Sequence, residues 1–82
     1  MSKWIITKDI IENGDDNGVT GSKGKPSEKD STKFRMLDSD DIVYYEGLCD
    51  DSSSFAPLDD FGMPNAGCTD IQYLENGKWE IL

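Results

Sequence analysis

The chain has 82 residues, with 17 acidic and 8 basic side chains and a formal net charge of −9. It contains no histidine, which excludes Ser–His and Cys–His nucleophile pairs, and its two cysteines cannot complete a common zinc site without carboxylates or a second chain. No run of about 18 apolar residues is present, so we expect no membrane span. We therefore expect one small domain over residues 1–82 that is not an enzyme and holds no cofactor or metal.

The N-terminal segment predicts a strand and then a long loop. Residues 3–11 read KWIITKDII, a β-branched and aromatic composition that is typical of a strand. Residues 12–32 contain four glycines and only Val19 as an aliphatic residue. Such a segment buries too little apolar surface to offset the entropy of ordering it, so we expect a mobile loop.

The next segment predicts a β-hairpin. Residues 33–37 read KFRML, and their alternation places Phe34 and Met36 on the inner face of a strand. Residues 42–48 read IVYYEGL and form the partner strand, with the acidic stretch 38–41 as the turn.

A second hairpin is predicted at the C-terminus. Asn76-Gly77 stands between two strand-like runs, residues 69–75 and 78–82, and Asn-Gly in this position is the strongest short hairpin signal. Between the hairpins, residues 56–62 are compatible with one helical turn, because proline suits the first helical position and aspartate suits the first turn. We expect a mainly β fold: a small curled antiparallel sheet or a partly open barrel of about five strands, with at most one short helical turn.

The two cysteines, Cys49 and Cys68, leave two alternatives open. The N-terminus contains Asp9 and no small-residue cleavage site, so it does not resemble a signal peptide. We therefore expect a cytoplasmic protein with free thiols, because disulfides are rare in that compartment. A structural disulfide is the alternative, and the spacing of the two residues does not decide between them.

Negative charge is concentrated in one half of the chain. Residues 36–77 carry ten acidic and no basic side chains, whereas residues 1–35 carry six acidic and seven basic ones. Such a field repels nucleic acid and anionic membranes and attracts basic surfaces. We predict that one acidic surface binds a partner, a protein with a basic surface, and that it includes Asp38, Asp40, Asp41, Asp50, Asp51, Asp59 and Asp60.

The acidic residues allow three other interpretations. Carboxylates two positions apart in a strand lie about 6.5 Å apart, near the spacing of phosphates along a nucleic acid strand, which suggests a DNA-mimic inhibitor. The stretches 13–18 and 38–41 are rich in oxygen ligands but do not fit the calcium-loop pattern. The third interpretation is that residues 44–68 are only a structural cover, with acidic side chains that keep the protein soluble.

Two stretches resemble a group of short bacterial hypothetical proteins. These stretches are FRMLDSDDIVYYEG (34–47) and FAPLDDFGMPNAGCTDIQY (55–73), and the group shares a similar acidic hairpin turn and a similar Pro-Leu-Asp-Asp-Phe-Gly-x-Pro-Asn-Ala-Gly-Cys loop. Ser39 departs from the pattern, since the group has an acidic residue there. No activity is assigned to the group, so the resemblance implies no functional residue; it favours a shared role for the loop.

Overall fold

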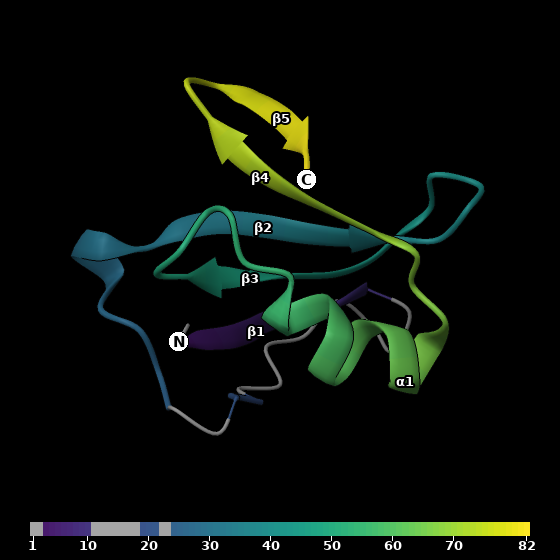
Figure 1. The fold of residues 1–82 in the computed structure, drawn as a ribbon, viewed down its shortest axis with the longest axis horizontal. Helices are drawn as coiled ribbons and strands as arrows, with labels where there is room; N and C mark the ends of the chain where they lie inside the picture. The colour runs from purple at the N-terminus through teal and green to yellow at the C-terminus, as the bar shows by residue number, and fades with distance from the viewer. Residues whose placement is uncertain (1–2, 11–18, 22–23) are drawn as a thin grey trace.

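The computed structural model describes residues 3–10, 19–21 and 24–82 of the chain (Figure 1). Within them, five strands form one open antiparallel sheet in the order β1-β3-β2-β4-β5. This confirms the predicted mainly β fold of about five strands. The strands are β1 (Trp4–Asp9), β2 (Thr32–Leu37), β3 (Val43–Cys49), β4 (Asp70–Glu75) and β5 (Lys78–Ile81).

Both predicted hairpins are present. Strand β2 pairs with β3 across the turn 38–41, and Phe34 lies opposite Gly47. Strand β4 pairs with β5 so that Glu75 faces Lys78 across a two-residue turn. The turn residues Asn76 and Gly77 both have positive φ, 53° and 79°, as the favoured type I′ turn requires.

The core lies on the inner face of the sheet, under the helix. The alternation of β2 and β4 places Phe34, Met36, Ile71 and Tyr73 there, and each is at most 1% exposed. The rings of Phe34 and Tyr73 meet edge to face, with centroids 6.0 Å apart. Trp4 and other side chains complete the cluster, which comprises Trp4, Ile6, Phe34, Met36, Tyr45, Cys49, Leu58, Cys68, Ile71 and Tyr73.

The helix is longer than the single turn predicted over residues 56–62. A π-helical segment, η3 (Leu58–Gly62), continues directly into α1 (Met63–Ala66). The helix approaches the sheet closely at Gly62, where an added Cβ would lie 2.5 Å from the sulfur of Met36. Glycine therefore permits the packing that holds this helix on the inner face of the sheet.

Strand β5 presents its larger side chains to the outer face of the sheet, the side away from the helix. Trp79 lies opposite Leu74, so it shares a face with Leu74 rather than with the buried Tyr73. The guanidinium of Arg35 stacks 4.4 Å from the centre of the Trp79 ring, and its Nε donates to Oε1 of Gln72 at 2.7 Å. Trp79 is thus half-buried under a cation rather than part of the core.

The two edges of the sheet differ. The free side of β1 is bridged by the segment 19–21, since Ile5 pairs with Thr20 and the amide of Ile6 donates to the carbonyl of Val19 at 2.7 Å. The predicted mobile loop 12–32 thus contains the bridge at Thr20 and the 3-10 turn η2 (Glu28–Asp30), whereas residues 12–18 and 22–23 lie outside the described residues, and its mobility stays a prediction. No helix in the described chain is long and apolar enough to cross a membrane.

Candidate functional site

The aspartates predicted to bind a partner fall into three places, the first being the β2–β3 turn. Oδ1 of Asp38 accepts hydrogen bonds from the amides of Asp40, at 2.8 Å, and Ile42, at 3.1 Å. The bond from Ile42 is the main cause that lowers the pKa of Asp38, and the hydroxyl of Tyr44 adds to it. The same contact with Asp38 raises the pKa of Tyr44. Asp38 therefore holds the turn, which leaves the exposed Asp40 and Asp41 beside it.

The second place follows the end of β3. Oδ1 of Asp50 accepts from the amide of Lys3 at 2.9 Å, and the amide of Asp50 donates to the carbonyl of Lys3 at 3.1 Å. Oδ1 of Asp51 accepts from both the amide and the hydroxyl of Ser53, and these bonds lower the pKa of Asp51. Both aspartates thus fix local structure: Asp50 ties the start of β1 to the end of β3, and Asp51 closes a turn.

The third place is the helix. Asp59 and Asp60 lie in η3 and are exposed. Among the seven predicted aspartates, Asp38, Asp50 and Asp51 accept side-chain hydrogen bonds from other described residues. The carboxylates of Asp59 and Asp60 accept none among those residues. Their position in the first turn suits the helix dipole, but it leaves their oxygens available to a partner.

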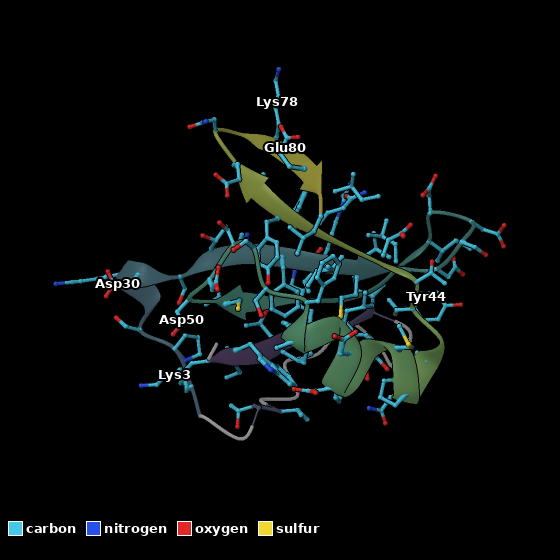
Figure 2. All side chains as sticks on the ribbon, in the orientation of Figure 1. Lys3, Asp30, Tyr44, Asp50, Lys78 and Glu80 are labelled. Atoms are coloured by element: carbon cyan, nitrogen blue, oxygen red, sulfur yellow. The ribbon has the colours of Figure 1, made fainter. Side chains whose placement is uncertain are left out.

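The structure does not bring the seven aspartates together. The turn 38–41 precedes β3, and the pair Asp50–Asp51 follows it. The strand has seven residues and is about 20 Å long, so the two places lie at its opposite ends. Figure 2 shows this separation, with Tyr44 near one end of the sheet and Asp50 beside Lys3 near the other. Because screening acts over about 8 Å at physiological salt, these groups act as separate charges. The turn aspartates at 38–41 and the pair Asp50–Asp51 therefore lie at opposite ends of β3 rather than at neighbouring edges, and the binding of one partner by all seven aspartates stays a prediction.

One of the three groups borders a pocket. A cavity of about 430 Å³ opens between β1, the segment 19–21 and the helix, and Asp60 stands in its wall. Its volume lies within the range of small-ligand sites. The lining residues are Trp4, Val19, Thr20, Gly21, Asp60 and Phe61.

Aromatic rings form the floor of this pocket. The rings of Trp4 and Phe61 are tilted by 55° with centroids 6.0 Å apart, and Tyr45 supports Phe61 edge-on at 4.9 Å. Gly21 lies against the indole, since an added Cβ there would come within 2.5 Å of Nε1 of Trp4. Any larger residue at position 21 would therefore displace the indole of Trp4, so glycine allows this segment to pack directly against the ring.

Sequence reasoning did not identify the pocket residues. The sequence predicts Trp4 only as part of the strand 3–11, and Phe61 only as part of the structural cover 44–68. Within that segment the structure buries Leu58 and leaves Phe55 46% exposed, so Phe55 does not cover the core. The available signal was an aromatic residue directly after two adjacent aspartates, DDF at 59–61, which places a ring next to two carboxylates.

The cysteines lie in the core rather than in the pocket. Cys49 and Cys68 are both fully buried and free in the structure. Burial raises the pKa of Cys68 to about 11, which makes its thiol a poor nucleophile at neutral pH. Tyr73 lies in the same core; its hydroxyl donates to the carbonyl of Ser54 at 2.8 Å, and burial is the main cause that raises its pKa.

Neither a metal site nor a similar known protein was found that would assign a role to this pocket. Among the described residues, no group of three or more His, Cys, Asp or Glu side chains is placed to hold a metal ion. The oxygen-rich stretch 13–18 lies outside those residues. Comparisons with protein-family models, with curated proteins and with solved structures found no match. The resemblance to short bacterial hypothetical proteins accordingly stays a prediction.

Proposed function

We propose that this protein is a small non-enzymatic binding protein whose partner is a protein with a basic surface, and that the contact centres on Asp59, Asp60 and the adjoining pocket. The observation that carries the proposal is the combination of Trp4 and Phe61 with the carboxylate of Asp60 in one cavity. Aromatic faces attract cations, and a nearby carboxylate adds direct Coulomb attraction.

The chemistry of the pocket favours a lysine or arginine side chain as the inserted group. Such a side chain buries its aliphatic stem against apolar walls and keeps its charge near the rim. In this pocket the stem would lie along Val19 and Phe61, and the charged head would lie by Asp60. The net charge of −9 would also speed the approach of a basic partner.

A titration with a short lysine peptide tests this proposal. We expect the indole N–H signal of Trp4 to shift in the NMR spectrum, while that of Trp79, on the outer face, serves as an internal reference. Replacing Asp59→Asn together with Asp60→Asn should weaken peptide binding about two- to thirtyfold, since each of two exposed ion pairs contributes about 0.2–1 kcal/mol.

The matched control removes two charges elsewhere. Asp40→Asn with Asp41→Asn gives the same net charge at exposed positions in the β2–β3 turn, and it should leave peptide binding nearly unchanged. Equal losses in both double variants would refute a localised site and would leave only general attraction between opposite charges.

The alternative function, a DNA-mimic inhibitor, predicts a different result. A mimic must compete with DNA for a DNA-binding protein, and it needs a row of carboxylates at phosphate spacing. The engagement of Asp38, Asp50 and Asp51 in backbone hydrogen bonds weighs against such a row. Displacement of duplex DNA from the isolated partner would favour the alternative.

A further inference from the structure

Strand β5 leaves one edge of the sheet open. It is the last strand in the order, and among the described residues no strand or bridge pairs with its outer side. The opposite edge, at β1, is bridged by Thr20. Figure 2 shows Lys78 and Glu80 on this outermost strand, with Lys78 directed away from the rest of the molecule. An open edge offers unpaired amides and carbonyls to another strand.

The pairing with β4 determines which backbone groups face outward. The amide of Leu82 donates to the carbonyl of Ile71 at 3.1 Å, and hydrogen-bonded pairs alternate along an antiparallel ladder. Glu80 and Lys78 therefore direct their backbone groups toward β4, in register with Tyr73 and Glu75. It follows that the amide and carbonyl of Trp79 point to the open side.

The charges on β5 are complementary to those of a second copy in one register only. If Trp79 pairs with Trp79 of an antiparallel copy, then Lys78 of each chain lies opposite Glu80 of the other. This arrangement places the outward backbone groups of both Trp79 residues in a hydrogen-bonded pair, and it brings two opposite-charge pairs into direct contact across the strands.

Neighbouring registers are disfavoured by charge. A two-fold axis at Glu80 would place Glu80 opposite its own copy, and an axis at Lys78 would do the same for lysine. Like charges directly opposite each other destabilise strand pairing. A single edge lysine would protect against association, but a lysine and a glutamate two positions apart form a self-complementary edge.

We propose that two copies of this chain associate through β5, as an antiparallel pair centred on Trp79, to form a continuous ten-stranded sheet with two-fold symmetry. The contact would cover Ile81, which is 65% exposed, and part of the outer face around Trp79. Because β5 has only four residues, the dimer belongs to the weak class of small interfaces. The pocket at Asp60 takes no part in this contact.

Sedimentation velocity over a concentration series tests the association. We expect the wild-type chain to change from monomer to dimer as its concentration rises. Lys78→Glu and Glu80→Lys, made singly, should each weaken the dimer about tenfold or more, because each replaces two attractive pairs with two repulsive ones. The double variant, Lys78→Glu with Glu80→Lys, exchanges the charges, keeps the net charge and should restore the dimer.

Amide exchange supplies a readout that depends on the register. Protection of the Trp79 amide should rise with protein concentration, while that of Glu80, which faces β4, should stay constant. Circular dichroism of each variant verifies that the fold is retained. A chain that stays monomeric at every concentration would overturn the proposal, as would a double variant no better than the single ones. The proposal would also be overturned if β5 paired with a strand of another protein and never with a second copy of this chain.

Discussion

Removing the hydroxyl of Tyr73 should detach the loop that follows β3. Tyr73 is 1% exposed, and its hydroxyl donates to the carbonyl of Ser54, nineteen positions away in sequence, at 2.8 Å. Tyr73→Phe keeps the ring and its contact with Phe34 but removes this bond. The loss of one such hydrogen bond costs about 1 kcal/mol, because the half-buried Ser54 carbonyl regains only part of its hydration.

Urea and thermal unfolding measure this cost. A loss of about 1 kcal/mol lowers the melting temperature of a domain of this size by about 4–8 °C. The denaturant slope should be unchanged, because the substitution alters stability and not the surface exposed on unfolding. Amide exchange at residues 52–56 should quicken more than at β2, since the bond joins that loop to the sheet.

Two comparisons make the Tyr73 prediction refutable. Tyr44→Phe also removes a hydroxyl, but that hydroxyl contacts Asp38 at the surface, so the variant should be closer to wild type. The pKa of Tyr73 is raised in the folded chain, so its contribution to stability is complete below about pH 10, the ordinary tyrosine pKa, and declines as the pH rises further. Tyr73→Phe should therefore lessen alkaline destabilisation. Equal stabilities of the Tyr73 variant and wild type, or a larger loss in Tyr44→Phe, would refute the reasoning.

Two further predictions concern the thiols and the acidic turn. Iodoacetamide at pH 8 should label Cys68 slowly in the folded protein, because burial raises its pKa to about 11, and should label both Cys49 and Cys68 in urea; two unlabelled cysteines in urea would indicate a disulfide. Asp38→Ala should lower the melting temperature at pH 7 more than Asp40→Ala does, because Asp38 alone accepts the turn amides. The pKa of Asp38 is lowered in the folded state, so this difference should be present above about pH 4 and vanish as the pH falls through that lowered pKa; a difference that persists in acid would contradict it.

The strands were predictable because their signals are local. The alternation around Phe34 and Met36 and the Asn76-Gly77 turn each determine structure within a few residues, and both hairpins follow from them. The sequence predicts a helix shorter than the observed one, because Gly62 and Pro64 are residues that commonly end a helix. Its burial against Met36 outweighs those propensities, and that contact is not visible in the sequence.

The face of Trp79 illustrates a second limit. Alternation identifies which residues of one strand share a face, but it does not relate that face to a neighbouring strand until the turn type is known. The two-residue turn pairs Trp79 with Leu74, which places the indole on the outer side under Arg35. The aromatic residues of the C-terminal hairpin could thus lie in the core or on the surface. The register places Tyr73 in the core and Trp79 on the outer face.

The site was less predictable than the fold because it joins segments that are distant in sequence. Asp38 closes its own turn, which a local rule for aspartate anticipates. Asp50 bonds to Lys3, forty-seven positions away, and no local rule finds such a pair. The pocket likewise joins Trp4 of β1 to the loop residue Gly21 and to Phe61 of the helix, so it exists only once the sheet order is known.

The hydrogen bonds that some aspartates make to the backbone determine which substitutions can be used to measure binding. Replacing Asp38, Asp50 or Asp51 removes acceptors of backbone amides, so any loss of binding in those variants would mix a lost contact with a displaced loop. Asp59 and Asp60 bear no such bonds among the described residues, and Asp60 lines the aromatic pocket. Asp40 and Asp41 are likewise exposed, and they lie in the β2–β3 turn rather than on the helix. A difference in binding between the Asp59–Asp60 and Asp40–Asp41 double variants can therefore be assigned to position, because both remove the same charge from exposed sites.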